Sequence, residues 1–151
     1  MKFWIFWHLK GCMMLPKIED KIKSIRKDLA LLDRLKPDCH TKFVSDEIYQ
    51  GALLHYLYRV SDNSISIAEM VIKYKDLPRA KSYYDSIDLL GEYRVIPPDF
   101  AYDFAKIASF RNFLAHHYEN IDYKMICEKT LDKLSDIEQY LQYIQKYLEQ
   151  N

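Results

Sequence analysis

TKFVSDEIYQGALLHYLYRVSDNSISIAEMVIKY, residues 41–74, contains no proline and only one glycine, Gly51. Its apolar side chains recur at helical intervals, at Tyr49, Leu53, Tyr56, Val60, Ile67 and Tyr74. Side chains three or four residues apart share one face of an α-helix, so this spacing predicts one long helix with an apolar stripe. Asn63 falls on that stripe and is either a satisfied structural amide or part of a site, because a buried amide needs hydrogen-bond partners.

A helix is also predicted upstream of this stretch. Pro16 suits a first helical turn, and one apolar stripe follows it at Ile18, Ile22, Ile25, Leu29 and Leu32. Lys36-Pro37-Asp38 then ends the helix. The opposite face mixes lysines and arginines with acids, which favours a solvated face over an RNA-binding one in a chain of zero net charge.

Two further helices are predicted downstream. Ser82 with Asp85 resembles a capping box for a short helix through about Leu90, and Gly91 suits the end of that helix. Pro97-Pro98-Asp99 introduces the next helix, because proline fits the first turn and aspartate favours the positive end of the helix dipole.

The last predicted helix begins near Asp122 and closes the bundle. Its apolar stripe runs through Ile126, Leu134, Ile137, Leu141, Ile144 and Leu148. Tyr140, Tyr143 and Tyr147 widen this stripe, and we expect part of it to contact another copy of the chain. With only 3 glycines and 5 prolines, the chain lacks the punctuation of many short strands. The fold predicted is therefore all-α, an up-and-down helical bundle of four to five helices.

The first residues differ in composition from the rest. The aromatic run from Phe3 to Trp7 is too short to span a membrane, and it lacks the small-residue cleavage site of a secretory signal. Because Met13 and Met14 follow directly, we interpret residues 1–13 as an extension before the true translation start. Residues 14–151 then form the helical domain.

Composition limits what the protein can do. At 151 residues the chain fits one domain. Its 22 basic and 22 acidic residues cancel, so no overall positive field gathers nucleic acid, and any RNA contact must be local. The 3 cysteines are far apart and in no metal-ligand spacing, which predicts neither a disulfide framework nor a zinc site. A reducing cytoplasm is the expected location.

The predicted fourth helix carries the most distinctive chemistry. Arg111 interrupts an apolar stripe made by Phe100, Phe104, Ile107 and Leu114. Arginine presents a planar positive fork that suits phosphate oxygens, and the nearby His116 can exchange a proton near neutral pH. Together with the hydroxyl of Tyr118 they indicate phosphodiester chemistry. The alternative is a structural salt bridge between Arg111 and a carboxylate.

Spacing tests how these side chains could meet. Asn112 and His116 are four residues apart and share a face. Arg111 and His116 are five apart, so their directions differ by roughly 140° and the arginine must reach around, or the helix must end there. His116 and His117 are adjacent, which is not the spacing of a metal clamp.

Small side chains form a narrow strip on the same helix, at Ala101, Ala105, Ala108, Asn112 and Ala115. Such a strip lets another helix approach closely. That helix belongs either to the same bundle or to a second protomer.

Several short motifs together resemble the HepT branch of the HEPN family. They are Leu90-Gly91-Glu92, Val95-Ile96-Pro97, Phe110-Arg111-Asn112, His116-His117-Tyr118 and Ile121-Asp122. The resemblance covers roughly residues 15–150. It implies a homodimeric helical bundle that acts as the toxin of a type VII HEPN/MNT toxin-antitoxin pair, beside a small MNT-type nucleotidyltransferase antitoxin.

The resemblance also implies roles for individual residues. Arg111 and His116 become the catalytic pair of a metal-independent endoribonuclease, with Asn112 orienting the site and Tyr118 as the tyrosine that the antitoxin modifies by AMPylation. The two motifs of a dimer would meet across a twofold interface. RNA cleavage then needs no cofactor, whereas the antitoxin uses ATP and Mg²⁺. Transfer RNA is the first expected substrate, messenger RNA the second, and no membrane is involved.

Two other interpretations remain open. In one, the protein is a noncatalytic helical module that docks a nucleotidyltransferase or holds a nucleotide, and Arg111 binds phosphate or an acidic partner. In the other, the polar cluster only specifies a dimer.

Overall fold

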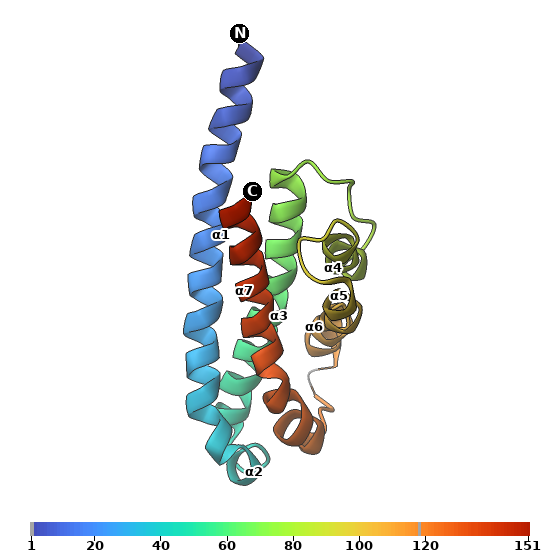
Figure 1. Ribbon diagram of the computed structural model, residues 1–151. Coiled ribbons are helices and arrows are strands. Elements are labelled where there is room, and N and C mark those ends of the chain that lie inside the picture. Colours follow the sequence, from blue (N-terminus) through green and yellow to red (C-terminus); the bar gives the residue numbers. More distant parts are fainter. Residues whose placement is uncertain (1, 118) are drawn as a thin grey trace.

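The computed structural model describes residues 2–117 and 119–151, which form an all-α bundle (Figure 1). Three long helices lie alongside one another: α1 (Lys2–Leu35), α3 (Glu47–Tyr74) and α7 (Leu134–Gln150). Shorter helices pack on the other side of α3: α4 (Tyr83–Glu92), α5 (Pro98–Phe104) and α6 (Ile107–His116). The predicted all-α class is confirmed, with five helices among the described residues if α5 and α6 count as one interrupted helix and the four-residue α2 is left out. None of the described helices is both long and apolar enough to cross a bilayer.

The core forms where the predicted apolar stripes meet. All five stripe residues of α1 are buried: Ile18, Ile22, Ile25, Leu29 and Leu32. Helix α3 lies between α1 and the short helices, and its Leu53, Val60 and Ile67 are fully buried. Helix α7 contributes Tyr140, whose hydroxyl donates a hydrogen bond of 2.9 Å to the carbonyl of Ser64. Burial raises the pKa of Tyr140. This tyrosine therefore packs inside the protomer rather than on a surface for another copy.

The helix caps explain where two elements begin. The Asp46 carboxylate accepts hydrogen bonds from the N–H groups of Ile48 and Tyr49, so α3 begins at Glu47 rather than near Thr41. The preceding residues form a short 3-10 turn, Lys36–Asp38, and α2 (Cys39–Lys42). The predicted cap of α4 is confirmed, because Ser82 Oγ accepts the N–H of Asp85 at 3.0 Å.

Three predicted boundaries were wrong. Helix α1 begins at Lys2 and continues through Pro16, so the helix tolerates the lost N–H of the proline instead of starting there. The predicted fourth helix is interrupted between Phe104 and Ile107, where bonding switches to the tighter i to i−3 pattern. The C-terminal segment first forms a π-helix, Met125–Thr130, and a 3-10 turn, Leu131–Lys133, before α7 starts. The interpretation of residues 1–13 as an extension stays a prediction.

A disulfide joins Cys39 to Cys127. It connects α2 to the π-helix that follows α6, across a sequence separation of 88 residues. The expectation of no disulfide was wrong because it used spacing along the chain. Only the folded chain brings these two cysteines together.

Gly91 marks the closest approach of α4 and α5. It was expected to end α4, but α4 continues to Glu92 and the left-handed residue beyond it is Arg94, with φ of 57°. A Cβ atom on Gly91 would lie 2.5 Å from the Cβ of Ala101. The glycine is therefore needed for close packing rather than for its backbone freedom. Ala101, Ala105 and Ala108 of the small strip are all buried within the protomer, so most of the strip serves packing inside one bundle.

We expect Gly91→Ala to lower the free energy of unfolding by about 1–3 kcal/mol, because the added methyl overpacks the α4–α5 contact. Gly51→Ala is the matched control, since a Cβ there meets no atom within 4 Å. That control should be neutral or stabilising by up to about 1 kcal/mol, given the higher helix propensity of alanine. Urea unfolding followed by circular dichroism measures both, and equal effects of the two substitutions would contradict the close contact.

Candidate functional site

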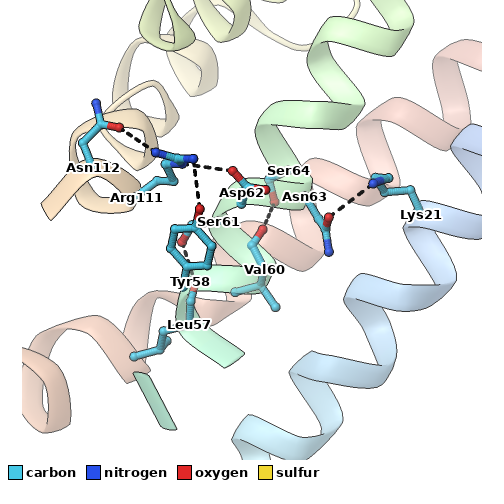
Figure 2. Close-up of polar contacts among 10 residues, drawn as sticks. All are labelled: Lys21, Leu57, Tyr58, Val60, Ser61, Asp62, Asn63, Ser64, Arg111 and Asn112. Carbon is cyan, nitrogen blue, oxygen red and sulfur yellow. Dashed lines mark hydrogen bonds and ion pairs between the residues drawn. The ribbon is translucent and has the colours of Figure 1, made fainter. Parts of the chain in front are cut away.

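Arg111 points from α6 toward α3, where a carboxylate and a hydroxyl receive it (Figure 2). Its Nε donates to Asp62 Oδ1 at 2.9 Å, and its Nη2 donates to the hydroxyl oxygen of Tyr58, also at 2.9 Å. Tyr58 and Asp62 are four residues apart on α3, so they present both acceptors on one helix face. The structure thus contains the ion pair that the sequence left as one of two alternatives for this arginine.

Two aromatic rings lie close to the guanidinium. Its central carbon lies 5.2 Å from the ring centroid of Tyr58 and 5.1 Å from that of Tyr83, at the start of α4. The Arg111 side chain keeps 17% of its surface exposed. Burial alone would lower the pKa of Arg111, but the hydrogen bond to Asp62 and the surrounding negative potential raise it above its usual value. The positive charge is therefore permanent and its orientation is fixed.

The guanidinium retains donor capacity after these contacts. Its Nη1 donates to Asn112 Oδ1 at 3.2 Å, so each of the three nitrogens has one partner in the protomer. A guanidinium has five N–H donors, and each terminal nitrogen carries two of them. Among the described residues, one N–H on Nη1 and one on Nη2 have no second acceptor. A pair of such donors on a rigid fork matches two oxygens of a phosphate group.

Asn112 is exposed and links Arg111 to a shallow hollow between α4 and α6. This hollow has a volume of about 360 Å³. Its lining comes from Ser82, Tyr83, Tyr84, Ala108, Ser109 and Asn112. The predicted supporting residue therefore faces both the arginine and a surface depression.

Arg111 together with Tyr58, Asp62 and Tyr83 is called the arginine cage below. His116 lies at the end of the same helix and makes none of the contacts of this cage. It is the last residue of α6 and is exposed to solvent. No polar contact between described residues joins its imidazole to Arg111, as the rotation of roughly 140° over five helical residues requires. Its neighbour His117 stacks on Phe113, with ring centroids 5.5 Å apart. Tyr118, the predicted modification site, lies outside the described residues.

Sequence reasoning missed the residues that hold the arginine. It considered Asn63 on α3, but Asn63 faces α1, where its Oδ1 accepts from Lys21 Nζ at 3.4 Å (Figure 2). The preceding residue, Asp62, points the other way and receives Arg111. The sequence did contain a signal for this contact. A buried arginine needs a carboxylate partner, and α3 carries the acid Asp62 four residues after Tyr58.

The described residues contain no group of three or more histidine, cysteine or acidic side chains placed to hold a metal ion.

Comparison with known proteins identifies a family. The family model described as "Ribonuclease HepT-like" matches residues 20–144. The chain is also 24% identical over 127 residues to the protein named "mRNA nuclease HepT" of Shewanella oneidensis, covering 84% of this chain and 95% of that protein.

Solved structures show the same fold. A tri-AMPylated Shewanella oneidensis HEPN toxin, determined in complex with an MNT antitoxin, superposes with a TM-score of 0.77 at 23% identity, covering 85% of this chain and 96% of that one. The Bacillus subtilis protein YutE, described as a cytosolic protein of unknown function, superposes with a TM-score of 0.72 at 21% identity. That match covers 89% of this chain and 90% of YutE. At these identities the likeness establishes a HEPN-like arrangement of helices.

Proposed function

Because the chain belongs to the HepT-like ribonuclease family, we propose that Arg111 and His116 form its RNA-cleaving site and that it is the toxin of a type VII HEPN/MNT toxin-antitoxin pair. The observation that carries this assignment is the caged guanidinium. Asp62 and Tyr58 fix its orientation, and two N–H donors are left to meet a phosphate. The exposed Asn112 beside it supplies an amide that can contact the same phosphate.

The proposed chemistry uses the RNA's own hydroxyl. The 2′-oxygen attacks the adjacent phosphorus while the bond to the 5′-oxygen of the next nucleotide breaks, which leaves a 2′,3′-cyclic phosphate and a 5′-hydroxyl. His116 acts as general base on the 2′-hydroxyl or as general acid on the leaving oxygen. Arg111 stabilises the charge that develops on the nonbridging oxygens, and Asn112 orients the scissile group. No metal ion or other cofactor takes part in this step.

We propose that the complete site needs two protomers. Within one protomer, Arg111 points into the α3–α4 side of α6, whereas His116 is exposed at its end. One imidazole also cannot easily serve both the attacking and the leaving oxygen. A homodimer with a twofold axis near the end of α6 would place two histidines at one cleft.

Messenger RNA is the substrate that we propose first, because the Shewanella oneidensis relative is named as an mRNA nuclease. Transfer RNA is the second candidate. Local contacts must select the substrate in either case, since the net charge of the chain is zero.

One observation favours a different function. The Arg111–Asp62 ion pair already neutralises the guanidinium, as expected if the cluster only stabilises a noncatalytic module that docks a nucleotidyltransferase or nucleotide. Cleavage assays separate the two functions.

We expect Arg111→Ala and His116→Ala each to lower the rate of RNA cleavage by about 10²–10⁴-fold, because they remove charge stabilisation and proton transfer. Cleavage by the unaltered protein should persist in EDTA. The matched controls are Arg34→Ala in α1 and His40→Ala in α2, which remove an exposed arginine and an exposed histidine away from Arg111 and should cleave RNA normally. Circular dichroism checks folding of each variant. Equal cleavage by His116→Ala and the unaltered protein would exclude the catalytic role and favour the noncatalytic module.

We further propose that the antitoxin neutralises the toxin at Tyr118. The tyrosine hydroxyl attacks the α-phosphorus of ATP, bound with Mg²⁺ by the antitoxin, and pyrophosphate leaves. The Shewanella oneidensis toxin, which carries AMP groups in its complex with an MNT antitoxin, supports this proposal. An adenylate two residues from His116 adds bulk and negative charge that can occupy the cleft and the free donors of Arg111.

Incubation with the cognate nucleotidyltransferase, ATP and Mg²⁺ should add adenylate to Tyr118 and abolish cleavage, as peptide mass mapping and RNA gels would record. Tyr118→Phe removes the acceptor hydroxyl and should keep cutting after the same treatment. Loss of activity while Tyr118 stays unmodified would contradict this mode of control.

A further inference from the structure

Two exposed tyrosines lie next to each other beside Arg111, and only the first of them, Tyr83, contacts its guanidinium. Tyr83 and Tyr84 begin α4 and keep 39% and 43% of their surface exposed. Both line the hollow of about 360 Å³ between α4 and α6. Two exposed aromatic rings beside a depression offer apolar surface that a ligand can cover.

The hollow and the arginine cage share residues. Tyr83 lines the hollow and also lies 5.1 Å from the Arg111 guanidinium. Asn112 lines it too, and its Oδ1 accepts a hydrogen bond from Arg111 Nη1. A ligand in the hollow would therefore be a direct neighbour of any phosphate on Arg111.

The lining has the chemistry of a nucleobase site. Two aromatic rings offer π-faces for stacking, and the small Ala108 leaves room for a flat group. The Ser109 hydroxyl and the Asn112 amide supply hydrogen-bond donors and acceptors at its edge. Bases of single-stranded RNA stack on aromatic side chains in this way.

We propose that this hollow binds one unpaired base of the RNA next to the scissile phosphate, with Tyr84 as the stacking residue. The inference rests on the proposed function and names the feature of the substrate that the site selects. Tyr83 is already engaged with Arg111, so Tyr84 offers the available ring face. Stacking also supplies affinity that a chain of zero net charge cannot draw from its overall field. A base paired within a duplex cannot enter, so the site selects single-stranded RNA.

Binding is best measured in a His116→Ala background, which keeps the RNA intact. Anisotropy of a short fluorescein-labelled, unstructured RNA should show about five- to 100-fold weaker binding for Tyr84→Ala. Tyr84→Phe should bind within about twofold of the parent, because phenylalanine keeps the ring. Tyr93→Ala is the matched control, since Tyr93 is similarly exposed, at 44%, at the opposite end of α4, and its loss should leave binding unchanged.

Abasic nucleotides locate the base. One abasic position in the RNA should weaken binding by the parent as much as Tyr84→Ala does, and the two changes together should cost no more than either alone. Blunt duplex RNA should bind the parent and Tyr84→Ala equally. Three results would each overturn the base site. The first is that every abasic position weakens binding additively with Tyr84→Ala, and the second is that Tyr84→Ala weakens the binding of duplex RNA as much as that of single-stranded RNA. The third is that Tyr84→Ala binds the unstructured RNA as tightly as the parent.

The same variants separate this inference from its premise. RNA that binds through Tyr84 but is never cut by the unaltered protein rejects the proposed nuclease and keeps the base site. Normal cleavage by Tyr84→Ala with unchanged KM keeps the nuclease and rejects the base site. Two further measurements on Tyr84→Ala are its oligomeric state by light scattering and its binding to the antitoxin. A Tyr84→Ala variant that loses dimers or the antitoxin while binding RNA normally would assign the ring to a protein contact and overturn the proposal.

Discussion

Arg111 carries a permanent charge on a helix face that is otherwise apolar, and burying such a charge without a partner costs several kcal/mol. In this bundle, Asp62 and Tyr58 of α3 accept hydrogen bonds from the guanidinium, and the ring of Tyr83 lies next to it. Helices α3, α4 and α6 are thereby tied at one point. The position of α6, and with it the place of Asn112 and His116, depends on this cluster.

A structural ion pair and a catalytic role are compatible in this cluster. A catalytic guanidinium is most effective when its orientation is set before the substrate arrives. Asp62 supplies that fixed orientation through Nε, whereas the donors proposed for the phosphate lie on Nη1 and Nη2. In the proposed homodimer, the exposed imidazole at the end of α6 would approach the same phosphate from another direction.

The local part of the fold was predictable from the sequence, because the stripe from Ile18 to Leu32 and the Ser82 cap depend on neighbours a few residues away. Contacts between distant segments were not. Asp62 as partner of Arg111, the Cys39–Cys127 bond and the need for Gly91 opposite Ala101 arise only from tertiary packing. Arg111, Asn112 and His116 stood out by residue type in an apolar pattern, whereas Tyr58 and Tyr83 were hidden among 13 tyrosines.

The identity of the RNA ends after cleavage tests the central claim most directly, since the proposed mechanism uses the neighbouring 2′-hydroxyl as the attacking group. Mass spectrometry of the products should find a 2′,3′-cyclic phosphate and a 5′-hydroxyl, and a single 2′-deoxy nucleotide at the cleaved position should block cutting. A 3′-hydroxyl with a 5′-phosphate, or undiminished cutting of the deoxy substrate, would contradict the account.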